Sequence, residues 1–281
     1  MSAPLSTLLG ALLSGSLSGL LSGCASLPPT RSVEVNGQRT AFVQAGGSPP
    51  VAVFQAGLGD GKAVWAGVIE QVTPGLAVFA HDRPGYGDSS AEPAGPRDPC
   101  TLARELHATL QAAGVKPPFL LVGHSIGGLY QLAFAHLYPQ EVAGLLLVDP
   151  THPDHWARMQ REAPAAARLA TGLRATVFSR TMRAEFDAQA QPACIAELQA
   201  LPPLAVPARL LVRSDFSLAE RGDFEALVRQ LELAWAAWVP GISRRQVAGA
   251  GHYIQKDQPG VVAEELQALA RAARKAEATP R

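Results

Sequence analysis

The chain has no excess of positive or negative charge, because its 281 residues include 24 basic and 24 acidic side chains. A nucleic-acid-binding protein normally shows a basic stripe, so the balance argues against a nucleic-acid partner. The sequence also lacks a dinucleotide fingerprint and a phosphate-binding loop, and it contains no internal repeat. We therefore expect no cofactor, and a small molecule as the partner of a monomeric protein.

Charged side chains are absent from residues 1–23, which are rich in Leu, Ser, Gly and Ala. Glycine and serine interrupt this stretch, which makes it a poor membrane-spanning helix. It ends in Leu21-Ser22-Gly23-Cys24, which resembles the lipobox of bacterial lipoproteins, although no Lys or Arg precedes the apolar stretch as in most secretory signals. The alternatives are a disordered leader and an upstream sequence that is not translated.

The resemblance to a lipobox implies that residues 1–23 are a signal peptide and that Cys24 is lipidated at the start of a mature chain, 24–281. Ala25 follows, where an Asp would favour retention at the inner membrane. We therefore expect a bacterial envelope protein that faces the periplasm and is anchored to a membrane by lipid, with the outer membrane favoured.

Cysteine is scarce: beyond Cys24 only Cys100 and Cys194 remain. Export would place them where disulfides persist. Cys100 begins a predicted helix and Cys194 lies late in a long segment between two predicted strands. A bridge between them and two buried thiols are both open, because the sequence does not give the distance that the bond requires.

Apolar runs alternate with amphipathic stretches along the remaining chain, which predicts an α/β fold with a mostly parallel central sheet of about eight strands flanked by helices. The predicted strands are residues 32–35, 40–44, 51–55, 77–80, 119–122, 144–148, 208–212 and 244–247. The predicted helices are residues 62–71, 101–113, 126–137, 224–238 and 261–276.

One segment, about residues 150–207, is longer than any ordinary connection between two strands. It contains apolar residues at helical spacing, such as Ala167, Leu169 and Leu173, and it ends near Pro202-Pro203. We predict a helical cap over the functional site, with an insertion packed elsewhere as the alternative.

Residues 119–128 carry the strongest chemical signal, because an apolar strand leads into Gly-x-Ser-x-Gly and then into a helix. A serine at such a sharp strand-to-helix turn exposes its hydroxyl above the sheet, and Gly123 and Gly127 leave room where backbone passes closely. The N–H of Ile126 opens the helix, where a substrate oxyanion would form. Ser125 is therefore the predicted nucleophile.

Four stretches together resemble the α/β-hydrolase superfamily, nearest to its small esterase and methylesterase-like members. They are Gln55-Ala56-Gly57-Leu58-Gly59-Asp60, Asp82-Arg83-Pro84-Gly85-Tyr86-Gly87, Gly123-His124-Ser125-Ile126-Gly127-Gly128 and Gly251-His252. The resemblance covers residues 31–276 and implies the α/β-hydrolase fold. It also implies a catalytic order of serine, acid and histidine along the chain.

In that order His252 is the predicted base for Ser125, and the acid is one of two aspartates that follow neighbouring strands. Asp215 stands at the position that most family members use, although the usual glycine is missing around it. Asp149 stands at a position that some members use, or is a turn residue before a proline. We favour Asp215 and keep Asp149 as the alternative.

The backbone N–H groups of Leu58 and Ile126 are the predicted oxyanion donors. Arg83 is predicted to pair with a carboxylate rather than with substrate, and His124 to pack beside the serine. His152 and His155 imitate a metal site with the acidic residues near them, but Pro153 makes a regular helical turn there doubtful. We predict no metal.

The expected reaction is hydrolysis of a carboxylic ester of a small molecule through an acyl-enzyme. Hydrolysis of C–C bonds, lactones or amides, and acyl transfer, would use the same triad. A non-catalytic binding protein on the same fold is the rival from another class.

Overall fold

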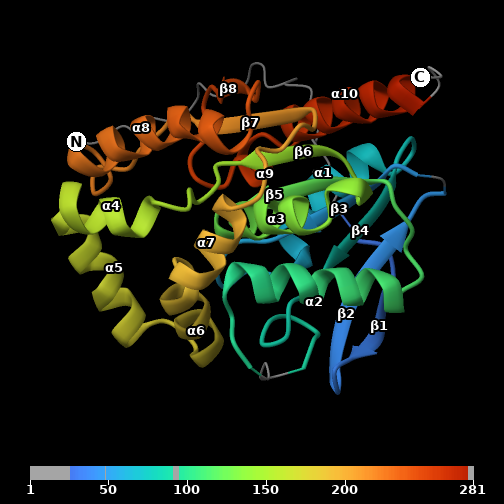
Figure 1. Ribbon diagram of the computed structural model, residues 1–281, viewed down its shortest axis with the longest axis horizontal. Coiled ribbons are helices and arrows are strands. Elements are labelled where there is room, and N and C mark those ends of the chain that lie inside the picture. Colours follow the sequence, from blue (N-terminus) through green and yellow to red (C-terminus); the bar gives the residue numbers. More distant parts are fainter. Residues whose placement is uncertain (1–25, 48, 91–94, 278–281) are drawn as a thin grey trace, which may run out of the picture.

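A computed structural model describes residues 26–47, 49–90 and 95–277 (Figure 1). Its centre is one eight-stranded sheet with the order β1-β2-β4-β3-β5-β6-β7-β8. The first two strands pair in an antiparallel way, as do β2 and β4, and every other neighbouring pair is parallel. The strands are β1 (Thr30–Val35), β2 (Gln38–Ala45), β3 (Val51–Gln55), β4 (Ala77–His81), β5 (Phe119–His124), β6 (Val142–Val148), β7 (Ala208–Arg213) and β8 (Ser243–Val247).

The eight predicted strands and the mostly parallel sheet are confirmed. Strands β3, β4 and β5 are buried along their whole length, because helices cover both faces of the sheet. Strands of this kind read as continuous apolar runs, which is why short segments of the sequence located them.

Helices cover both faces of the sheet and enclose a separate apolar core on each side. On one side lie α2 (Pro99–Ala112), α3 (Ile126–Leu137) and α8 (Asp223–Trp238). On the other lie α1 (Ala66–Val72), α9 (Ile254–Asp257) and α10 (Pro259–Glu277). Two short 3₁₀ helices, η1 (Lys62–Trp65) and η2 (Pro139–Glu141), precede α1 and β6. Within the described ranges, no helix is both long enough and apolar enough to cross a membrane.

Four helices fill the long segment between β6 and β7 (Figure 1). They are α4 (His155–Glu162), α5 (Pro164–Thr176), α6 (Arg180–Ala188) and α7 (Pro192–Gln199). Their apolar residues divide between two environments: Ala167 is buried, whereas Leu169 and Leu173 are exposed on α5. We call these four helices the cap.

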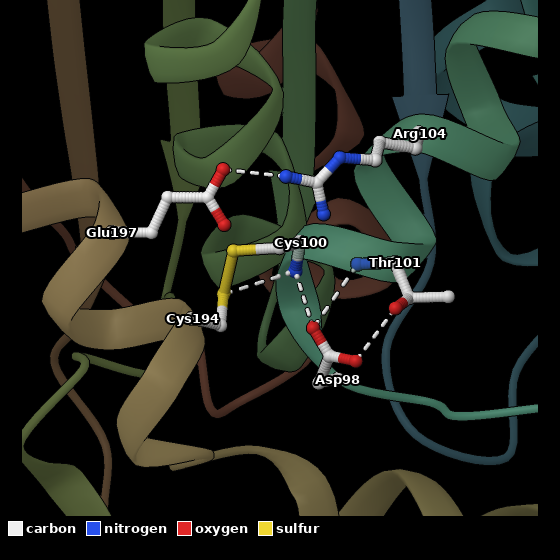
Figure 2. Close-up of a disulfide and its surroundings, with 6 residues drawn as sticks. All are labelled: Asp98, Cys100, Thr101, Arg104, Cys194 and Glu197. Carbon is white, nitrogen blue, oxygen red and sulfur yellow. Dashed lines mark hydrogen bonds and ion pairs between the residues drawn. A yellow bond between two sulfur atoms is a disulfide. The ribbon is translucent and has the colours of Figure 1, made fainter.

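A disulfide between Cys100 and Cys194 joins the first turn of α2 to α7 (Figure 2). It therefore links a helix that covers the sheet to a helix of the cap. Asp98 caps α2 by accepting hydrogen bonds from the backbone N–H groups of Cys100 and Thr101. Of the two alternatives that the sequence left open, the structure has the bridge.

Four buried histidines and the half-buried His155 make the fold sensitive to mild acid. Burial lowers the pKa of His81 to about 3 and that of His136 to about 4. It also lowers the pKa values of His124, His152 and His155. Between these values and the unfolded value of about 6.5, the unfolded chain binds more protons than the folded one, so stability is lost as the pH falls below about 6.5.

We therefore expect the free energy of unfolding in urea to fall between pH 7 and pH 5, by about 1–2 kcal/mol for each histidine that stays neutral in the fold. Carboxylates with lowered pKa values, such as Asp149 and Glu185, change the free energy of unfolding only at a pH below this range of 5 to 7. His136→Leu removes one of these groups and should flatten the pH dependence by one histidine's share. Equal unfolding free energies at both pH values would contradict the prediction.

Candidate active site

Ser125 occupies a strained turn at the end of β5. Its φ of 54° and ψ of −129° place it in a region that non-glycine residues rarely adopt, and α3 begins at the next residue. The turn is tight because a Cβ on Gly127 would lie 2.4 Å from the carbonyl oxygen of Gln55. The glycines of the motif therefore let β3 pass directly beside the serine, as the sequence pattern predicted.

His252 follows β8 and reaches back to the serine. Its Nε2 lies 3.1 Å from Ser125 Oγ, and its Nδ1 lies 2.6 Å from Asp149 Oδ2. With Nδ1 protonated, the ring donates to the carboxylate and accepts the serine hydroxyl proton at Nε2. The carbonyl oxygen of His252 accepts a hydrogen bond from His124 Nε2, which fixes the loop against the serine turn.

Asp149 is held beside this turn by the backbone on both sides of it. The N–H of Ser125 donates to the carbonyl of Val148, and the N–H of Thr151 donates to the carbonyl of Ser125. Asp149 itself has a φ of 44°, which bends the chain as it leaves β6. Burial alone would raise its pKa, but the hydrogen bond to His252 and the charge of Arg213 keep that pKa below its ordinary value. The carboxylate is thus ionised, the form that orients a histidine.

Asp215, the aspartate favoured from the sequence, lies outside this arrangement, and the carboxylate that contacts His252 is that of the alternative, Asp149. Its side chain is exposed and accepts a hydrogen bond from the Ser214 hydroxyl, while its backbone N–H donates to the carbonyl of Ala250. The alternative aspartate, Asp149, occupies the acid position.

Arg213, the last residue of β7, lies beside both Asp149 and His252. Its Nε donates to Asp149 Oδ2 at 2.7 Å, and its Nη2 lies 2.9 Å from His252 Nδ1. Its Nη1 donates to Glu220, and the guanidinium lies over the ring of Phe216. Sequence reasoning missed this residue, although an arginine directly after the apolar run at residues 210–212 was a visible signal.

The loop after β3 lies against the serine turn from the other side. A Cβ on Gly57 would lie 3.0 Å from His124 Nδ1, and the positive φ of Gly59 closes the turn. The side chain of Leu58 packs against Ile126 in a small apolar cluster. The two residues predicted to donate to the oxyanion, Leu58 in the loop after β3 and Ile126 at the start of α3, therefore belong to one apolar cluster.

Two subsidiary predictions have clear outcomes. Arg83 does pair with a carboxylate, that of Glu185 in the cap, at 2.9 Å. His124 is buried beside the serine turn, with its ring 4.7 Å from that of His252. Glu185 itself is a residue that sequence reasoning missed.

The histidines considered for a metal are engaged otherwise. His152 Nδ1 accepts the backbone N–H of Asp154, and His155 packs edge-on against Phe224. In the part of the chain that the structure describes, the one group of potential ligands close enough to share an ion is Asp98 with the two disulfide cysteines.

Comparison with known families matches residues 50–209, more than half of the chain, to the alpha/beta hydrolase fold. The protein therefore belongs to the α/β-hydrolase family. It is 33% identical to the uncharacterized protein YqjL of Bacillus subtilis (strain 168) over 109 residues, which are 39% of this chain and 43% of that protein. The chain thus spans less than half the length of this curated relative.

Two solved structures share the fold. Cfl2 from Burkholderia cenocepacia superposes with a TM-score of 0.64 and 22% identity, covering 86% of this chain and 95% of that one. A thermophilic esterase from Thermogutta terrifontis superposes with a TM-score of 0.60 and 20% identity, covering 87% and 99%. At these identities the likeness establishes the fold alone.

Proposed function

We propose that the protein is a serine hydrolase that cleaves a carboxylic ester of a small molecule through an acyl-enzyme. The observation that carries the proposal is the continuous contact from Ser125 Oγ through His252 to Asp149, at 3.1 and 2.6 Å. A hydroxyl needs such a base to act as a nucleophile near neutral pH.

In the proposed reaction Ser125 Oγ attacks the ester carbonyl carbon while His252 Nε2 takes the hydroxyl proton. The carbonyl oxygen becomes an oxyanion that the N–H groups of Leu58 and Ile126 stabilise. As the C–O bond breaks, His252 returns the proton to the leaving alcohol. Water then attacks the acyl-enzyme by the same route and releases the acid, while Asp149 stabilises the imidazolium in both halves.

Cleavage of C–C bonds, lactones or amides, and acyl transfer to an alcohol, remain the alternatives, because they use the same groups. A serine at the nucleophile position argues against relatives that attack through an aspartate. The non-catalytic alternative would not require the serine, histidine and carboxylate to be in contact.

We further propose that the mature chain is exported and held at the envelope by a lipid on Cys24, as a monomer. Residues 1–25, including the signal peptide and Cys24, lie outside the described residues. The disulfide between Cys100 and Cys194 supports an oxidising compartment, since cytosolic thiols stay reduced.

Covalent labelling with a fluorophosphonate probe tests the proposed nucleophile. We expect the wild type to be labelled, and Ser125→Ala and His252→Ala to lose labelling, because the first lacks the nucleophile and the second lacks its base. Ser32→Ala changes an exposed serine on β1 and should label like the wild type. A folded wild type that resists labelling would favour the binding protein.

A library of nitrophenyl esters then tests the substrate class. The sequence of the cap contains few aromatic residues and no dense charge cluster, so we expect an uncharged acyl or alcohol group of modest size. Faster turnover of long-chain or anionic esters than of short, neutral ones would contradict this expectation.

A further inference from the structure

Arg83 holds the loop that carries the proposed oxyanion donor. Its side chain is 3% exposed, and its Nη1 and Nη2 donate to the carbonyl oxygens of Ala56 and Gly57 at 2.7 and 2.8 Å. A guanidinium can bridge two neighbouring carbonyls in this way because its donors form a rigid, planar fork. An ammonium lacks that geometry.

The bond to Gly57 has a direct consequence for Leu58. The carbonyl of Gly57 and the N–H of Leu58 belong to the same peptide unit, which is planar and resists rotation. Fixing the direction of that carbonyl therefore fixes the direction of the N–H. Arg83 thus fixes the direction of the Leu58 N–H without contacting it.

The arginine is itself fixed by the cap. Glu185 on α6 is fully buried and accepts from Arg83 Nε at 3.0 Å and from Nη2 at 2.9 Å. The same carboxylate accepts from Arg97 Nη2 at 2.9 Å and from the hydroxyl of Tyr86 at 3.0 Å. Its other contact, with the hydroxyl of Tyr130 on α3, reaches the helix that begins after the nucleophile.

Helix α6 also lies directly on the glycine-rich loops. A Cβ on Gly59 would lie 3.1 Å from Met182 Cε, and one on Gly85 would lie 2.2 Å from Thr181 Oγ1. The charges within the network balance, because Arg97 also donates to Glu105 at 2.9 Å. Arg83, Arg97 and Glu185 are thus buried together, with Glu105 at the partly exposed edge of the network, and moving α6 would leave Arg83 buried without its carboxylate.

We propose that Glu185 is a positioning residue of the active site: through Arg83 it directs the Leu58 N–H, so that seating α6 completes the oxyanion hole. The inference rests on the proposed hydrolase function and extends it, because it makes the cap part of the machinery that stabilises the transition state. A cap that served only to enclose substrate would influence binding instead.

The test compares Arg83→Lys and Glu185→Gln with Arg97→Lys, in the full chain with the disulfide intact. Arg97 contacts the same carboxylate with the same kind of side chain but makes no bond to the loop. We expect Arg83→Lys to lower kcat about 10- to 100-fold with KM within about threefold, because a displaced oxyanion donor affects the transition state and not the ground state. Arg97→Lys should keep kcat within about threefold of the wild type.

A boronic acid that forms a tetrahedral adduct with Ser125 gives a readout that a purely structural role would not move. Its inhibition constant should rise in parallel with the loss of kcat, since the adduct places an oxygen in the oxyanion hole. The free energy of unfolding of each variant separates this loss from a loss of folded protein. Glu185→Gln preserves the shape of the side chain and decides the question if Arg83→Lys does not fold.

Equal kcat in Arg83→Lys and Arg97→Lys at equal folded fraction, or an unchanged kcat in folded Glu185→Gln, would overturn the inference while the active wild type upholds the hydrolase. A folded wild type with neither turnover nor labelling would instead overturn the proposed function, and the inference with it.

Discussion

Asp149→Asn should lower kcat by about 10³–10⁴-fold, whereas Asp215→Asn should leave it within about twofold of the wild type. The amide cannot stabilise the imidazolium that forms when His252 takes the serine proton, and it permits the wrong tautomer of the ring. Asp215 bonds only within its own exposed loop and the neighbouring backbone, so its charge is not needed. The two variants are a matched pair, because they make the same chemical change at the ends of neighbouring strands. Asp149 directly follows β6, and Asp215 stands two positions beyond β7.

Stability must be measured beside activity, because Asp149 also neutralises Arg213. The arginine side chain is 7% exposed and would keep only the partly exposed Glu220 as an ionic partner. Breaking a buried ion pair from one side commonly costs about 3–5 kcal/mol, so kinetics should be compared at temperatures where both variants are fully folded. A large loss of kcat in Asp215→Asn, with Asp149→Asn nearly as active as the wild type, would return the acid role to Asp215.

The choice between these aspartates shows where sequence reasoning ends. Strand ends in a parallel sheet meet at one edge, so the pattern located both candidates at the ends of the neighbouring strands β6 and β7. Which carboxylate faces the ring depends on the backbone. The positive φ of Asp149 and the two bonds that flank it turn that side chain inward, and no local pattern encodes such a turn.

The ion pair between Arg83 and Glu185 in the cap could not be predicted from the sequence for a different reason. Arg83 lies in a motif that is typical of the family, and its need for a carboxylate followed from the chemistry of a buried guanidinium. The partner, Glu185, lies 102 residues further along the chain, on an amphipathic helix that also carries the acidic Asp187. Only the packing of α6 against the loops selects it. By contrast, the Gly-x-Ser-x-Gly motif pointed to Ser125 directly, and His252 was predicted from its place in the chain order that the family resemblance implies.

Loss of the bridge between Cys100 and Cys194 should lower the free energy of unfolding by about 2–5 kcal/mol. The bond closes a loop of 94 residues that includes β5, the nucleophile and most of the cap, so it removes much conformational freedom from the unfolded chain. We expect the urea midpoint of Cys100→Ala/Cys194→Ala to be well below that of the oxidised wild type, and reductant to bring the wild type to the same midpoint.

The neighbouring ion pair provides the matched control for the bridge. Arg104 and Glu197 join the same two helices, but both are largely exposed, and such pairs contribute about 0–1 kcal/mol (Figure 2). Arg104→Gln should therefore shift the midpoint far less than the double alanine variant. Alkylation of Cys100 and Cys194 in the folded protein without reductant would contradict the bridge. A midpoint insensitive to both reduction and the double substitution would mean that apolar packing of α7, through its buried Leu198, holds the cap to the core without the covalent bond.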